Sequence, residues 1–86
     1  MARIEFIIVE HDDLTDVKSD IDNAGLDTYV DRYKYTNKYN VQITTYPLDE
    51  YELDDLLGEL YEIYGYNNVR VKWEKLQTLL HVLKLD

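Results

Sequence analysis

The sequence predicts an α+β domain: a four-stranded antiparallel sheet with two helices on one face, followed by a C-terminal helix or a fifth strand. Two segments carry apolar residues at helical spacing, and they alternate with four segments rich in β-branched residues and tyrosine. Helix-capping residues and turn residues separate these segments. The 86 residues contain no linker, repeat or low-complexity stretch, so we expect a single domain over residues 1–86.

The first strand is predicted at residues 3–9, which are nearly continuously apolar, as expected of a central strand covered on both faces. A helix is predicted at residues 13–24, with Asp12 or Asp13 as its N-cap and Gly25 just past its end. Its apolar residues fall on one helical face: Leu14, Val17, Ile21 and Ala24.

A hairpin is predicted next, with strands at residues 28–35 and 39–46 around a polar turn at residues 36–38. Tyrosine and valine are enriched in the first of these strands, and simple alternation puts Val30 on the side opposite Tyr33. The second strand alternates apolar and polar residues, which predicts that it is half-buried.

The second helix is predicted at residues 49–64 and has well-marked ends. Asp49 is a good N-cap, Glu52 lies three residues later as a capping box requires, and Gly65 follows the last turn. Gly58 lies inside this helix, where glycine costs about 1 kcal/mol relative to alanine. We expect it to be a small residue packed against the sheet; the alternative is a point where another chain approaches closely. The buried side is predicted to hold Leu53, Leu56, Leu57, Leu60 and Ile63 or Tyr64.

A turn at residues 66–68 leads to a brief strand at residues 69–72. Two split βαβ units with right-handed crossovers then give an antiparallel sheet with both helices on one face, which is the ferredoxin-like arrangement. Beyond the last strand, residues 73–83 fit a C-terminal helix, and a fifth strand is the alternative. Their apolar positions are Trp73, Leu76, Leu79, Leu80, Val82 and Leu83.

Acidic residues outnumber lysine and arginine by 18 to 9, for a net charge of -9. This balance works against binding to nucleic acid or to anionic membranes and favours cationic partners. Eight acids fall in residues 10–31 and seven in residues 49–62, where Lys18 is the only cation. If the two helices share a face, that face carries a strongly negative field.

The candidate binding residues are acids on the two helices, with tyrosines beside them. A solvated surface usually mixes its charges, because like charges at i,i+4 repel. A helix face that carries almost only acids therefore suggests a partner of opposite charge. Carboxylates at i and i+4 lie about 6 Å apart along a helix, close to the spacing of neighbouring phosphates. The simpler interpretation is a surface that keeps a small protein soluble. The predicted partner-binding residues are Asp13, Asp16, Asp20, Tyr51, Glu52, Asp55, Glu59, Tyr61 and Glu62.

No residue pattern supports an enzyme, a cofactor or a metal site. The chain has no cysteine and no glycine-rich phosphate loop, and the adjacent residues of Glu10-His11-Asp12-Asp13 do not converge as spaced metal ligands do. No apolar run approaches the roughly 20 residues of a membrane span, and the N-terminus lacks the regions of a signal peptide. We therefore expect a non-enzymatic cytoplasmic protein that has no cofactor.

Residues 4–71 resemble an ACT-type regulatory domain in Phe6-Ile7-Ile8-Val9, in Ala24-Gly25-Leu26 and in the helix positions between them, Leu14, Val17 and Ile21. The resemblance implies a regulatory or oligomerisation role. ACT domains usually place a glycine in the loop after the first strand, and here that loop is Glu10-His11-Asp12-Asp13.

In general character the chain also resembles small acidic phage-encoded inhibitors, including anti-CRISPR proteins and other DNA mimics. That resemblance implies a protein that acts in the host cytoplasm by occupying the basic groove of a nucleic-acid-binding protein, such as a CRISPR effector, without touching nucleic acid itself. This inhibitor is the predicted function. The alternative is an ACT-like domain that pairs as a homodimer through its C-terminal helix or a strand edge.

Overall fold

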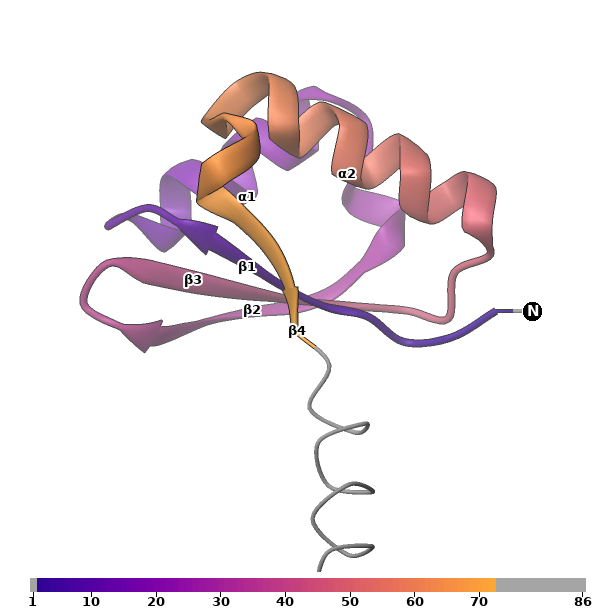
Figure 1. Ribbon diagram of the computed structural model, residues 1–86, viewed down its shortest axis with the longest axis horizontal. Helices are drawn as coiled ribbons and strands as arrows, with labels where there is room; N and C mark the ends of the chain where they lie inside the picture. The colour runs from indigo at the N-terminus through magenta and orange to yellow at the C-terminus, as the bar shows by residue number, and fades with distance from the viewer. Residues whose placement is uncertain (1, 73–86) are drawn as a thin grey trace, which may run out of the picture.

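A computed structural model describes residues 2–72, which form a four-stranded sheet and two α-helices (Figure 1). Two short 3-10 helices, η1 (Asp27–Tyr29) and η2 (Tyr66–Asn68), precede the second and fourth strands. The C-terminal helix or fifth strand predicted at residues 73–83 lies outside the described residues. The main elements are β1 (Phe6–Glu10), α1 (Leu14–Asn23), β2 (Val30–Asn37), β3 (Asn40–Thr45), α2 (Glu50–Tyr64) and β4 (Val69–Lys72).

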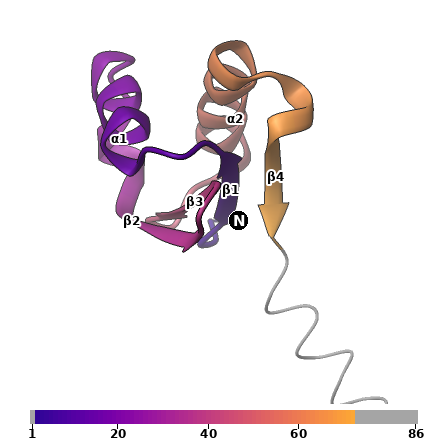
Figure 2. The same ribbon diagram turned by 90° about the vertical axis from the view of Figure 1, so that its left-hand side faces the viewer.

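The sheet has the strand order β2-β3-β1-β4, and every neighbouring pair is antiparallel. Both helices lie on the same face of this sheet, α1 beside β2 and α2 towards β4 (Figure 2). The predicted α+β class and the placement of both helices on one face are therefore confirmed. None of the helices within residues 2–72 is long and apolar enough to cross a membrane.

The core lies between the sheet and the two helices. Every one of its side chains is at most 7% exposed, and full burial of an aliphatic side chain stabilises a fold by about 1.5–3 kcal/mol. Alternate residues of β1, β3 and β4 point into this core, as the period of two requires. Its members are Ile7, Val9, Val17, Ile21, Val30, Val41, Ile43, Leu48, Leu56, Leu60 and Val69.

The predicted helix ends are confirmed. The Asp13 carboxylate accepts hydrogen bonds from the backbone N–H groups at the start of α1, and Asp49 and Glu52 form a reciprocal capping box at 2.9 and 3.0 Å. Gly25 and Gly65 have φ angles of +76° and +92°, which L-amino acids with side chains rarely adopt. Acidic caps at the starts and glycines just past the last turns therefore mark where both helices begin and stop.

The predicted alternation of β2 is wrong at its start. Val30 pairs with Thr45 and Arg32 with Thr44, so two residues of β2 oppose one residue of β3, which is a β-bulge. Val30 is consequently buried on the same side as Tyr33 instead of opposite to it. A second irregularity carries β2 on to Asn37, which shortens the predicted turn.

The predicted half-burial of β3 is also wrong, because every residue from Val41 to Thr45 is buried. The strand lies between β2 and β1, so side chains of its neighbours flank both of its faces. Alternation along one strand does not reveal this position in the sheet.

Replacement of Asp49 by alanine should remove the α2 cap and lower the free energy of unfolding by about 1 kcal/mol. Urea denaturation followed by circular dichroism measures this change. The matched control is Asp54→Ala, which removes an exposed charge from the same helix and should change stability by less than about 0.5 kcal/mol. Equal effects of the two substitutions would contradict the capping role.

Candidate functional site

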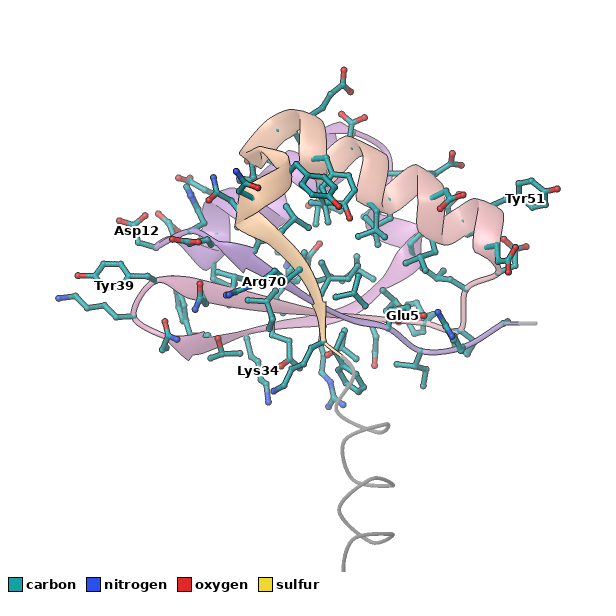
Figure 3. All side chains as sticks on the ribbon, viewed as in Figure 1. Glu5, Asp12, Lys34, Tyr39, Tyr51 and Arg70 are labelled. Atoms are coloured by element: carbon teal, nitrogen blue, oxygen red, sulfur yellow. The ribbon has the colours of Figure 1, made fainter. Side chains whose placement is uncertain are left out.

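Helix α2 carries the candidate surface. Its outer ridge consists of Tyr51, Asp55, Gly58 and Glu62, which are spaced at i, i+4, i+7 and i+11 and are all exposed. Tyr51 is 84% exposed and points away from the body of the molecule (Figure 3). Within residues 2–72, neither carboxylate of the ridge forms an ion pair with a lysine or arginine. Among the described residues, the ridge therefore presents two carboxylates without a cationic partner and one exposed aromatic side chain.

Gly58 does not pack against the sheet, so the expectation from the sequence is wrong. The residue is exposed, and a Cβ added there would meet no atom within 4 Å. Its backbone is helical, and its φ angle is not positive. Neither packing within the described chain nor backbone geometry requires glycine here, although glycine costs about 1 kcal/mol relative to alanine at such a position.

Two of the acids predicted on the first helix are engaged within the molecule. Asp13 caps α1, and Asp20 is half-buried and accepts a hydrogen bond of 2.6 Å from the Tyr64 hydroxyl. Asp16 is exposed and lies 3.5 Å from His11 Nε2. Asp13 and Asp20 therefore do not form the free outward face that the sequence predicted for them, and the structure brings Asp20 to α2 instead.

The remaining predicted residues lie around the ridge, and some of their side chains already contact other parts of the molecule. The Glu52 side chain is used in the capping box, and Glu59 is half-buried at the flank of the ridge. Tyr61 packs against the core, and its ring lies 4.9 Å from that of Tyr66. Tyr66 is exposed and was not among the predicted residues. The sequence of a turn does not indicate which other ring its tyrosine will pack against.

The junction of the two helices holds a small polar cluster. The Tyr64 ring lies 5.6 Å from that of His11 and donates its hydrogen bond to Asp20. Burial raises the pKa of Tyr64 well above its usual range, and the hydrogen bond to Asp20 and the charges of Asp20 and Asp16 raise it further. The hydrogen bond between Tyr64 and Asp20 thus joins the end of α2 to α1.

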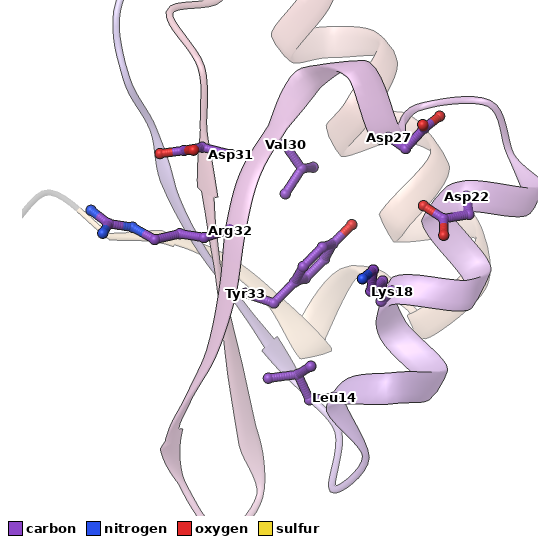
Figure 4. A pocket seen from close by; sticks show the side chains of 8 residues that line it. All are labelled: Leu14, Lys18, Asp22, Asp27, Val30, Asp31, Arg32 and Tyr33. Atoms are coloured by element: carbon purple, nitrogen blue, oxygen red, sulfur yellow. The ribbon is translucent and has the colours of Figure 1, made fainter.

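A groove of about 520 Å³ runs between α1 and β2 (Figure 4). The Tyr33 side chain extends across it from β2, and its hydroxyl is buried without a hydrogen-bond partner in the described residues. Burial raises the pKa of Tyr33 to about 12, and the charges of Asp22 and Asp27 contribute. Lys18 lies beside them, so the groove mixes both signs of charge and offers no single-sign ligand site.

No three histidine, aspartate or glutamate side chains within residues 2–72 come together in a way that would hold a metal ion. Comparison of the chain with protein-family models, with curated proteins and with solved structures gives no match in any of the three. The outer ridge of α2 therefore stands as the candidate site on its own geometry and charge.

Stability should fall with rising pH above about 10, partly because of Tyr33. Its folded-state pKa of about 12 lies above the value of about 10 for an unfolded tyrosine. The folded chain thus holds this proton more tightly, so the contribution is complete below pH ~10 and is lost as the pH rises towards ~12.

Urea denaturation from pH ~9.5 to ~11.5 checks this, with Tyr33→Phe expected to lose stability less steeply than wild type over that interval. The matched control is Tyr46→Phe, which removes the hydroxyl of a tyrosine that is 50% exposed. Parallel curves for wild type and Tyr33→Phe would contradict the role of Tyr33.

Proposed function

We propose that this chain is a non-enzymatic inhibitor that inserts the acidic outer ridge of α2 into the basic groove of a nucleic-acid-binding protein and blocks that groove by competition. Asp55 and Glu62 are exposed, carry no cationic partner within residues 2–72 and lie on a helix of 15 residues. Their carboxylates lie seven residues apart on the same ridge, about 10 Å along the helix. Tyr51 adds an exposed aromatic contact at one end of the ridge.

One observation carries this proposal: the exposed Gly58 in the middle of the ridge. Nothing within the described chain needs a glycine there, and it weakens the helix. Absence of a side chain at this position would let the surface of a partner come close to the helix backbone. A face kept only for solubility would tolerate any helix-forming residue at this position.

The partner class follows from the charge. A net charge of -9 repels nucleic acid, and a row of carboxylates attracts the lysine and arginine side chains that line nucleic-acid-binding grooves. Anti-CRISPR proteins and other phage-encoded DNA mimics work in this way, and a bacterial defence protein is the target that we propose.

We also infer that the fold is ferredoxin-like, since the order β2-β3-β1-β4 with both helices on one face matches the split βαβ pattern. The alternative function, an ACT-like domain that pairs through a strand edge, is less well supported. The edge strand β2 contains two irregularities, and bulges of this kind twist an edge away from pairing with another chain.

Replacement of Gly58 by alanine should separate stability from binding. The free energy of unfolding should rise by about 0.5–1 kcal/mol, because alanine favours the helix and the added Cβ meets no atom within 4 Å. Binding to the basic partner should weaken, and leucine at the same position should weaken it further. The matched control is Ser19→Ala on the exposed side of α1, which should stabilise the helix without weakening binding. Unchanged affinity of both Gly58 variants would contradict the proposal.

Charge reversal of the ridge tests the function directly. The tagged protein is used to capture proteins from a bacterial lysate at ~0.1 M and ~1 M salt, since screening weakens charge-based contacts. The captured protein is then bound to labelled DNA or RNA, and release of that nucleic acid on addition of this chain measures the inhibition. Asp55→Lys/Glu62→Lys should reduce capture and release by more than about tenfold, which corresponds to roughly 1.4 kcal/mol.

The matched control for this test is Asp12→Lys/Asp54→Lys, which makes the same change in net charge at exposed positions off the ridge. This control should keep most of the wild-type activity. Equal losses in the two double variants would mean that net charge alone matters, and capture that persists at ~1 M salt would argue against a charge-based mimic.

A further inference from the structure

Two tyrosine rings pack together at the C-terminal end of α2. Tyr61 lies in the last turn of the helix, and Tyr66 follows in η2. Their ring centroids are 4.9 Å apart, and the ring planes are inclined by 44°. Tyr61 packs against the core, whereas Tyr66 is 74% exposed. The pair therefore has an inner ring that the core supports and an outer ring that is open to solvent.

The turn after α2 determines where Tyr66 lies. Gly65 has a φ angle of +92°, and its N–H donates a hydrogen bond of 2.9 Å to the Tyr61 carbonyl. The Asn68 side-chain amide donates one of 2.7 Å to the Tyr64 carbonyl, and the Asn68 backbone N–H donates one of 3.1 Å to the Gly65 carbonyl. Tyr66 thus projects from a hydrogen-bonded turn, so a partner that contacts its ring pays little conformational entropy for the backbone.

Gly58 leaves open space next to the inner ring. Residues three and four positions apart on a helix are neighbours, so the neighbours of Gly58 are Asp54, Asp55, Tyr61 and Glu62. A Cβ at Gly58 would meet no atom within 4 Å. Long side chains on a helix lean towards its N-terminus, which brings the Tyr61 ring over the turn that contains Gly58. The gap at Gly58 therefore has an aromatic ring on one side and exposed carboxylates around the rest.

These surroundings suit arginine better than lysine. The guanidinium group is planar, stacks on aromatic faces and carries five N–H donors that carboxylates can accept. It is also more weakly hydrated than the ammonium group of lysine, so it loses less when it is placed against a ring. Lysine offers a compact charge that contacts aromatic faces less often.

We propose that the Tyr61–Tyr66 pair and the gap at Gly58 form a docking site for an arginine side chain of the basic partner. The stem of the arginine lies in the gap, its guanidinium stacks on the exposed ring of Tyr66, and its N–H groups donate to carboxylates of the ridge. This inference rests on the proposed function and adds which cation the ridge selects. An arginine that is bound here cannot contact a phosphate, so the site removes one of the partner's own contacts to nucleic acid.

Tyr39 offers a comparison within the molecule. It is 60% exposed, and the Lys38 ammonium lies over its ring, 5.5 Å from the centroid. A cation of the same chain therefore already occupies this ring. Tyr66 has a tyrosine on one side and solvent on the other, which leaves its ring accessible to an arginine from another protein.

Two peptides of equal length and charge test the site: an oligo-arginine and an oligo-lysine peptide. Isothermal titration at ~0.1 M salt measures the affinity of each. Wild type should bind oligo-arginine more tightly than oligo-lysine. Tyr66→Leu removes the ring and should weaken oligo-arginine binding by about two- to fivefold, the range expected of one exposed cation–π contact. It should leave oligo-lysine binding unchanged, and Tyr66→Phe, which keeps a ring, should retain the preference.

Two further variants define the site. Gly58→Leu fills the gap and should also reduce the preference for oligo-arginine. Tyr39→Leu is the matched control, because it removes an exposed tyrosine at the hairpin turn and should change neither affinity. Circular dichroism verifies that each variant is folded. In nuclear magnetic resonance spectra of wild type, the ring protons of Tyr66 should shift when oligo-arginine is added.

Three results would overturn the inference. One is a wild-type protein that binds neither peptide or binds both equally. Another is a preference for oligo-arginine that survives in Tyr66→Leu. The third is an equal loss of affinity for both peptides in Tyr66→Leu, because the ring would then contribute no selectivity.

The peptides also separate this inference from the proposed function. If wild type binds both peptides equally and Asp55→Lys/Glu62→Lys binds neither, the arginine site fails and the acidic ridge remains. If Tyr66→Leu loses the preference but wild type captures no nucleic-acid-binding protein from the lysate, the inhibitor proposal fails and the arginine site remains.

Discussion

The pairing of β1 with both β3 and β4 is the constraint on which the rest of the structure depends. In this register Ile7 lies opposite Ile43 and Val71, so one face of the central strands is apolar and accepts both helices. A slip of one residue would turn the apolar set outward and carry Arg70 and Lys72 under the helices. The large cost of burying unpaired charge therefore holds the register.

That same register sorts the charges of the molecule. Acids belong mostly to the helices and the segments beside them, and the cations of β2 and β4 gather on the opposite face of the sheet. A small domain with one covered sheet face thus acquires two surfaces of opposite sign. The proposed inhibition follows from this separation, because it concentrates the acids on the helices.

The acids themselves divide into two kinds. Asp13, Asp49 and Glu52 satisfy backbone N–H groups at helix starts, and Asp20 accepts the hydrogen bond of Tyr64. These acids stabilise the fold, and a partner could use them only by competing with those bonds. Asp55 and Glu62 have no such role in the described chain, which leaves their charge free for recognition. A large acid count thus overstates the number of binding residues.

The sequence by itself determined the element order, the helix ends and the acidic side of α2, because capping and helical spacing act within a few residues. It did not reveal the bulge at Val30, the complete burial of β3 or the exposure of Gly58. Each of these depends on which strand or helix lies alongside, and so only the tertiary structure decided them. The cations on the outer face of the sheet are the clearest case: Arg32 and Arg70 are 38 positions apart in the chain, and only the strand order brings them onto one surface.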